Sequence, residues 1–202
     1  RAILRASAAG PARLMLPMLT TAEEVEQALA LIKLAMQSLV RERTGFDPKL
    51  PIGGMIEIPA AALAAANFAR RLDFLSVGTN DLIQYTMAID RADDEVNYLY
   101  DPANPAVLQL IRHILRAGQR TTTPVAMCGE MAGDPRYIRL LLGFGLREFS
   151  MRPAMLPEVK RIVNGTSVHE IRTRCNAILR APTATHTERL IDALNSGLEG
   201  DG

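Results

Sequence analysis

Tryptophan is absent from this chain, and aromatic residues make up only 4% of its 202 positions. Hydrophobic residues still account for 48%, so a packed core is expected, built mainly from Ala, Leu, Ile and Met. Cysteine is scarce as well. The two cysteines, Cys128 and Cys175, do not make a disulfide framework, and we therefore expect a reducing, cytoplasmic setting.

A strong net charge and long apolar runs are also missing. The 23 basic and 22 acidic residues leave a net charge of +1, which gives no electrostatic reason to expect nucleic acid or a membrane surface as a partner. No apolar run is long enough to cross a bilayer, and no segment shows the pattern of a signal peptide, so we expect neither a membrane span nor a secreted protein. The first residue is Arg1 rather than Met, in a helical pattern without a cap. We therefore expect a piece of a longer polypeptide, with the missing part upstream.

What the chain does contain is an alternation of short apolar runs with amphipathic segments. Strands are predicted at residues 14–18, 52–57, 73–77, 124–128 and 147–151. Helices are predicted at residues 22–43, 60–71, 106–120 and 134–142, followed by a helical tail from about residue 157. Strands that alternate with helices in this way indicate parallel strands joined by right-handed crossovers, and hence an α/β fold.

Polar side chains cluster directly after the predicted strands. Glu57, Asn80 with Asp81, and Cys128 each follow or end one. Chemistry at the carboxyl ends of successive parallel strands is typical of the (β/α)8 TIM barrel, whereas a doubly wound sheet usually concentrates it at one crevice. A closed barrel has eight strands and about five are visible here. We therefore predict that residues 1–202 form the C-terminal portion of such a barrel, about strands 4–8, with the other strands upstream.

Glu57 and Asp81 are the candidate metal ligands. Glu57 could instead be a solvated carboxylate or the partner of a nearby arginine, and Asp81 could cap the helix that follows it. At equivalent ends of neighbouring strands, however, the two carboxylates would lie close enough to share one hard cation. Two carboxylates with open positions suit magnesium, which keeps waters and takes further oxygens from its substrate.

Three other residues are candidates for ligand binding or catalysis. Asn80 could satisfy a turn or contact a ligand, and Arg91 could be a surface cation or a fork that binds a carboxylate or phosphate. Cys128 could be a small buried hydrophobe, the commoner role of a lone cysteine in an apolar strand. At a strand end its thiol could also donate a proton to a carbanion or an enolate.

Five segments together resemble enzyme I of the phosphoenolpyruvate-dependent phosphotransferase system. They are residues 54–61, 76–91, 100–107, 128–134 and 148–151. The similarity runs in the same order from residue 1 to about residue 195, with no evident large gap. Pyruvate phosphate dikinase and phosphoenolpyruvate synthase share the Gly-Thr-Asn-Asp and Cys-Gly-Glu elements. Residues 84–91 and the Glu-Phe-Ser-Met ending look more like enzyme I.

The resemblance implies a phosphoenolpyruvate-binding (β/α)8 barrel that forms a homodimer. It implies that Glu57 and Asp81 bind Mg²⁺, that Asn80 and Arg91 bind the substrate, and that Cys128 protonates the enolate. The phosphoryl group would pass to a histidine on an upstream domain and then to a phosphocarrier protein, HPr or its nitrogen-branch counterpart, with release of pyruvate. The upstream phosphohistidine and carrier-binding domains, the first barrel strands and the family's other phosphate-binding arginines are absent here. We therefore expect the chain to be inactive alone.

Two rival interpretations stay open at this point. A dikinase-like or synthase-like enzyme would make phosphoenolpyruvate and use ATP, and would need a nucleotide-binding domain upstream. A non-catalytic dimerisation or regulatory module would not need to bind phosphoenolpyruvate with magnesium. Within the phosphotransferase interpretation, this segment fits both the sugar and the nitrogen branch.

Overall fold

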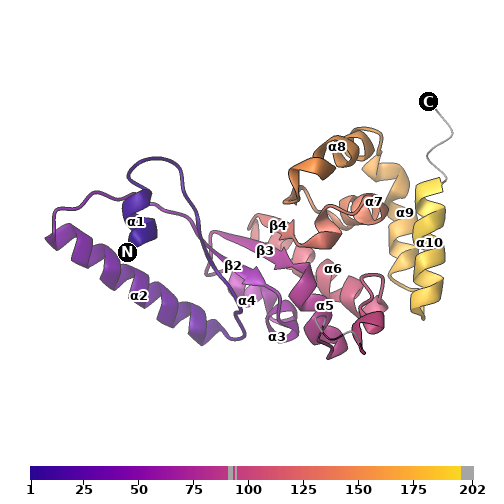
Figure 1. Ribbon diagram of the computed structural model, residues 1–202, viewed down its shortest axis with the longest axis horizontal. Helices are drawn as coiled ribbons and strands as arrows, with labels where there is room; N and C mark the ends of the chain where they lie inside the picture. Colours follow the sequence, from indigo (N-terminus) through magenta and orange to yellow (C-terminus); the bar gives the residue numbers. More distant parts are fainter. Residues whose placement is uncertain (91–92, 94, 197–202) are drawn as a thin grey trace.

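A parallel sheet forms the centre of the molecule (Figure 1). The computed structural model describes residues 1–90, 93 and 95–196. Within these residues five strands form one sheet in the order β1 to β5, and every neighbouring pair is parallel. The strands are β1 Leu14–Leu16, β2 Ile52–Ile56, β3 Phe74–Gly78, β4 Val125–Cys128 and β5 Glu148–Phe149. Sequential, all-parallel pairing is the arrangement of consecutive strands in a (β/α)8 barrel, so the predicted fold class is confirmed.

Helices connect the strands and continue beyond the last one. The α-helices are α1 Ala2–Ala6, α2 Ala22–Arg41, α3 Pro59–Leu63, α4 Ala65–Ala69, α5 Thr79–Met87, α6 Pro105–Thr121, α7 Pro135–Phe144, α8 Leu156–Asn164, α9 Val168–Ile178 and α10 Ala184–Ser196. The described residues also form short 3₁₀ turns, namely η1 Asn97–Leu99, η2 Glu130–Ala132 and η3 Pro153–Met155. The prediction of a single helix at residues 60–71 is wrong in one respect. The helix is interrupted at Ala64 (φ −92°, ψ 13°), and the segment forms α3 and α4 instead.

The core lies between the sheet and the helices that cover it. Ile56, Val77 and Met127 stand in register on β2, β3 and β4, and all three are fully buried. Phe68 of α4 and Ile111 of α6 are buried in the same cluster. Each such side chain contributes about 1.5–3 kcal/mol by leaving water. This packing fixes the three central strands and therefore the positions of the residues that follow them.

Helices α1 and α10 lie on opposite sides of the sheet (Figure 1). The long helix α2 begins with a capping box between Thr21 and Glu24 and projects away from the sheet, with a small separate cluster of Leu4, Leu39 and Leu50 at its far end. None of the helices in the described part of the chain is both long and apolar enough to span a lipid bilayer.

The helical tail packs against α7. Arg139 of α7 donates to Asn195 of α10 (3.1 Å), and Asn195 donates in turn to the carbonyl of Arg136 (3.0 Å). Cys175 of α9 fills the space over Gly143, where an added Cβ would lie 2.3 Å from Sγ. Burial raises the pKa of the Cys175 thiol to about 11. This cysteine is therefore a packing residue and stays protonated near neutral pH.

Candidate active site

The carboxyl ends of the strands bring the predicted residues into one row. Ile56, Val77 and Met127 are in register, so the next positions, Glu57, Gly78 and Cys128, follow side by side. The row extends to β5, because the backbone N–H of Ser150 donates to the carbonyl of Met127 (2.9 Å). Gly78 is required within this row, since a Cβ there would lie 2.7 Å from Glu57 Oε2. The missing side chain at Gly78 makes room for the Glu57 carboxylate.

Glu57 is a buried carboxylate, only 3% exposed. Its Oε1 accepts a hydrogen bond from the backbone N–H of Met18 (2.7 Å), and Met18 holds a left-handed backbone (φ 55°) just after β1. Such a conformation is rare outside glycine and costs on the order of 1–3 kcal/mol. Because it is buried, Glu57 is not a solvated carboxylate. Among the described residues it forms no ion pair, so it is not the partner of an arginine there.

Asp81 supplies the second carboxylate. It lies in the first turn of α5, whose N-cap is Gly78 and has no side-chain cap, so Asp81 does not cap this helix. Burial is the largest cause of the raised pKa of Glu57; the Met18 N–H opposes the shift, and repulsion by the Asp81 carboxylate and a hydrogen bond shared with it add to the shift. The two acidic groups are therefore close enough to interact.

A divalent cation fits this pair. Two close carboxylates, one of them buried, repel each other, and a hard cation between them would relieve that repulsion. The described residues include no group of three or more His, Cys, Asp or Glu side chains that could enclose a metal. Two protein carboxylates leave open positions, which is the donor set that magnesium accepts when a phosphorylated substrate and water complete its shell.

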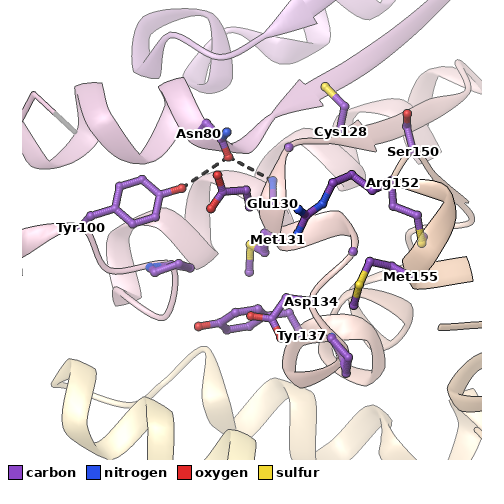
Figure 2. A pocket seen from close by; sticks show the side chains of 15 residues that line it. Asn80, Tyr100, Cys128, Glu130, Met131, Asp134, Tyr137, Ser150, Arg152 and Met155 are labelled. Atoms are coloured by element: carbon purple, nitrogen blue, oxygen red, sulfur yellow. Dashed lines mark hydrogen bonds between the residues drawn. The ribbon is translucent and has the colours of Figure 1, made fainter. Parts of the chain in front are cut away.

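The side-chain amide of Asn80 is oriented by its neighbours. Its Oδ1 accepts from the backbone N–H of Glu130 (3.1 Å) and from the hydroxyl of Tyr100 (3.4 Å), as Figure 2 shows. Because a backbone N–H can only donate, the accepting atom must be the amide oxygen. The amide nitrogen is therefore directed elsewhere and forms no hydrogen bond within the described residues. It can donate to an anionic ligand.

Cys128 lies at the end of β4 and is half-buried. Its Sγ accepts from the hydroxyl of Ser76 and donates to the carbonyl of Val77, both at 3.6 Å. Cys128 is among the residues that line a pocket, unlike the buried Cys175, and Figure 2 shows its sulfur directed away from the other labelled lining side chains. A thiol with a hydroxyl donor at its sulfur can release a proton to a ligand that reaches it and keep the resulting charge hydrogen-bonded.

The pocket runs along the carboxyl ends of β3, β4 and β5 and has a volume of about 810 Å³ (Figure 2). It is large enough for a three-carbon phosphorylated acid with additional space, since pockets for small ligands typically span about 300–1,000 Å³. Its polar lining comes from these residues: Asn80, Tyr100, Cys128, Glu130, Asp134, Tyr137, Ser150 and Arg152. Methionines 131, 151 and 155 are among its apolar lining residues.

Gly129 is expected to tolerate no side chain. It holds a left-handed backbone (φ 96°), and an added Cβ would lie 2.2 Å from Thr79 Oγ1 and 3.0 Å from Asn80 Oδ1. We predict that Gly129→Ala destabilises the full-length protein by about 1–3 kcal/mol, in urea-induced unfolding, and displaces the Asn80 amide. Gly10→Ala is the matched control, because nothing lies within 4 Å of its added Cβ. Equal stability of the two variants would contradict the prediction.

The structure thus brings Glu57, Asp81, Asn80 and Cys128 to one edge of the sheet. Arg91, the fifth predicted site residue, lies outside the described residues. Sequence reasoning missed Arg152 and the role of Tyr100 in holding Asn80. No local sequence pattern pointed to Arg152, since its place at the pocket depends on β5 ending at Phe149 rather than at residue 151.

Comparisons with known proteins agree on one family. The family model described as "PEP-utilising enzyme, PEP-binding domain", where PEP is phosphoenolpyruvate, matches residues 1–168. A phosphoenolpyruvate-protein phosphotransferase of Cupriavidus necator is 54% identical over 181 residues, which cover 90% of this chain and 31% of that protein. The protein of the same name from Haemophilus influenzae is 40% identical over 192 residues, 95% of this chain and 33% of that protein. The chain thus spans about a third of the length of these curated relatives.

One solved structure supports the barrel assignment. A citrate lyase from Burkholderia xenovorans aligns with a TM-score of 0.59 at 19% sequence identity, over 98% of this chain and 67% of that one. At this level of identity the likeness concerns the fold alone.

Proposed function

The chain belongs to the family of PEP-utilising enzymes, as their PEP-binding domain, and from this premise we propose that it is the phosphoenolpyruvate-binding part of a phosphoenolpyruvate-protein phosphotransferase. The observation that carries the proposal is that Glu57 and Cys128, at strand ends, and Asn80 and Asp81, in the first turn of α5, lie at one edge of the sheet. The similarity to phosphotransferases of the same name over 90% or more of the chain supports it.

Glu57 and Asp81 would hold a magnesium ion. Bound there, the ion supplies positive charge to the phosphoryl oxygens and to the developing enolate. The buried environment of Glu57 strengthens any charge interaction made there, and the Met18 N–H keeps its carboxylate in place. Both residues come from elements anchored in the core, so the pair is set before the ligand arrives.

Asn80 and Arg91 would bind the substrate anion. The amide nitrogen of Asn80 is held ready for this by the two hydrogen bonds on its oxygen. Arg91 is carried over from the enzyme I family as a second anion contact. With the ligand fixed by its oxygens, the phosphoryl group can leave towards a histidine of another domain.

Cys128 would complete the reaction by protonating carbon 3 of the enolate. The Sγ–H bond breaks, the C–H bond of the pyruvate methyl group forms, and the sulfur keeps the electron pair as a thiolate. Ser76 can then stabilise that thiolate through its hydroxyl. Formation of pyruvate, the more stable keto form, favours the phosphoryl transfer.

The partners follow from this assignment. We propose pyruvate as the product, a histidine of the same enzyme as first acceptor, and a phosphocarrier protein as second acceptor. We also propose a homodimer as the working unit and the cytoplasm as its location, which the two free thiols support.

The test is phosphoryl transfer by the full-length protein. With radiolabelled phosphoenolpyruvate and magnesium, we expect acid-labile label on a histidine of the protein and on an added phosphocarrier, with one pyruvate formed per phosphoryl group. Chelation of magnesium is expected to abolish both the labelling and the formation of pyruvate. Formation of ATP from AMP or ADP in place of protein labelling would favour the dikinase-like or synthase-like alternative. Absence of any phosphoenolpyruvate consumption would favour a non-catalytic module.

A further inference from the structure

Arg152 directs its side chain into the pocket from the segment that follows β5 (Figure 2). Its backbone is extended (φ −62°, ψ 139°) and is followed by Pro153, which restricts this residue to the extended region. Its carbonyl also accepts the N–H of Met155 (3.0 Å), which closes the turn η3. The position from which the guanidinium enters the pocket is therefore fixed.

The guanidinium forms no hydrogen bond or ion pair within the described part of the chain. It is also the only cation among the described residues that line the pocket. Of the two acids in the lining, Asp134 is already engaged as the N-cap of α7 through the N–H of Arg136 (2.9 Å). Methionines 131, 151 and 155 line the pocket beside it. An unpaired guanidinium beside apolar side chains is a strong binder of paired oxygens.

Arg152 shares its pocket with Asn80 and Cys128, two of the candidate ligand-binding residues, whereas Glu57 and Asp81 lie outside the lining. Metal-binding carboxylates follow β2 and β3, the proton donor ends β4, and Arg152 comes after β5, so the four lie in order along one edge. Phosphoenolpyruvate carries its carboxylate and the oxygen that bears its phosphoryl group on the same central carbon. With acidic Glu57, Asp81 and Glu130 at this edge, binding of such an anion requires positive charge besides the metal.

We propose that Arg152 is an anion-binding residue of this site, whose guanidinium takes two oxygens of phosphoenolpyruvate, from either its carboxylate or its phosphoryl group. The inference rests on the proposed function and adds to it a residue that determines affinity for the substrate.

The experiment compares full-length Arg152→Gln, Arg152→Lys and Arg180→Gln with the wild type. Arg180 is exposed in the turn after α9, so its variant removes the same charge far from the pocket. We expect Arg152→Gln to raise the KM for phosphoenolpyruvate about 10–100-fold, the usual effect of losing hydrogen bonds to a charged group, with a much smaller change in kcat. The KM of Arg152→Lys is expected to lie between those of the wild type and Arg152→Gln, because lysine keeps the charge and loses the paired hydrogen-bond geometry. Arg180→Gln is expected to match the wild type.

Two competitors identify the group that is bound. Oxalate is a planar dianion that resembles the carboxylate end of the enolate. Inorganic phosphate resembles the phosphoryl group. If oxalate alone inhibits Arg152→Gln more weakly than it inhibits the wild type, Arg152 binds the carboxylate of the substrate. If phosphate alone does so, Arg152 binds the phosphoryl group. An unchanged KM and unchanged inhibition by both, in a variant that unfolds at the wild-type Tm, would overturn the inference. An equal rise in KM in Arg180→Gln would also overturn the inference. A wild type that does not consume phosphoenolpyruvate would instead overturn the proposed function.

Discussion

Glu57→Gln in the full-length protein is expected to lower magnesium-dependent turnover of phosphoenolpyruvate by about 10²–10³-fold, the scale on which one preorganised electrostatic contact acts. Glutamine keeps the shape of the side chain and can still accept the N–H of Met18. It lacks the negative charge that would hold the cation beside Asp81. The loss should therefore fall on metal binding and chemistry, with the fold intact.

The same variant is expected to be more stable than the wild type when no metal is present. Burial and Asp81 raise the pKa of Glu57, so the folded state favours its protonated form. The stabilisation from this group is fully present below the unfolded-state pKa and is lost as the pH rises through the raised folded-state pKa. The glutamine side chain of the variant stays neutral at every pH, so near neutral pH Glu57→Gln should show the higher Tm in chelator.

Excess magnesium should reverse the order of the two Tm values, so that the wild type becomes the more stable protein. A ligand that binds only the folded state raises the Tm by mass action, and only the wild type has the full site. Tm measured by calorimetry with chelator and with excess magnesium checks both halves. Glu170→Gln on the exposed face of α9 is the matched control for loss of one acidic charge. A Glu57→Gln protein that is stabilised by magnesium as strongly as the wild type would exclude Glu57 as a ligand.

Cys128→Ala is expected to slow pyruvate formation by about 10²–10⁴-fold, the usual contribution of a positioned proton donor, while leaving phosphoenolpyruvate binding nearly unchanged. The Sγ lies 3.6 Å from Ser76 Oγ, and alanine removes the only thiol among the described residues that line the pocket. Calorimetric binding and pyruvate formation, measured on the same sample, separate the two effects.

Cys175→Ala is the control for this prediction. That cysteine is buried against Gly143, away from the pocket lining, so its loss should lower stability and leave pyruvate formation unaffected. The chirality of the methyl group formed from stereospecifically labelled phosphoenolpyruvate gives a second readout. A proton delivered by Cys128 reaches one face of the enolate, and protonation by solvent reaches both. Unchanged turnover and unchanged chirality in Cys128→Ala would remove Cys128 from the mechanism.

Much of this site could be predicted from the sequence because parallel strands place their following residues at one edge. Glu57, Asn80, Asp81 and Cys128 stand directly at strand ends, so a correct pattern of strands was enough to bring them together. The burial of Glu57 was not predictable, since it depends on Gly78 of the next strand and on the left-handed backbone of Met18.

Two other features required the tertiary structure. Ala-rich residues 60–71 favour helix throughout, and the break at Ala64 is set by packing of α3 and α4 against α6 and not by helix propensity. Arg152 was missed because the fifth strand was predicted to run to residue 151, whereas β5 ends at Phe149. The shorter strand leaves Ser150 to Arg152 free to turn over the pocket, which no local pattern specifies.

A crystal structure of the full-length protein with phosphoenolpyruvate, and with manganese in place of magnesium, would show whether Glu57 and Asp81 share one ion. Anomalous scattering locates the manganese ion without ambiguity. The result expected here is one ion bound by carboxylate oxygens of both Glu57 and Asp81 and by oxygens of the ligand. An ion bound elsewhere, or Glu57 and Asp81 turned away from each other with the ligand in place, would contradict it.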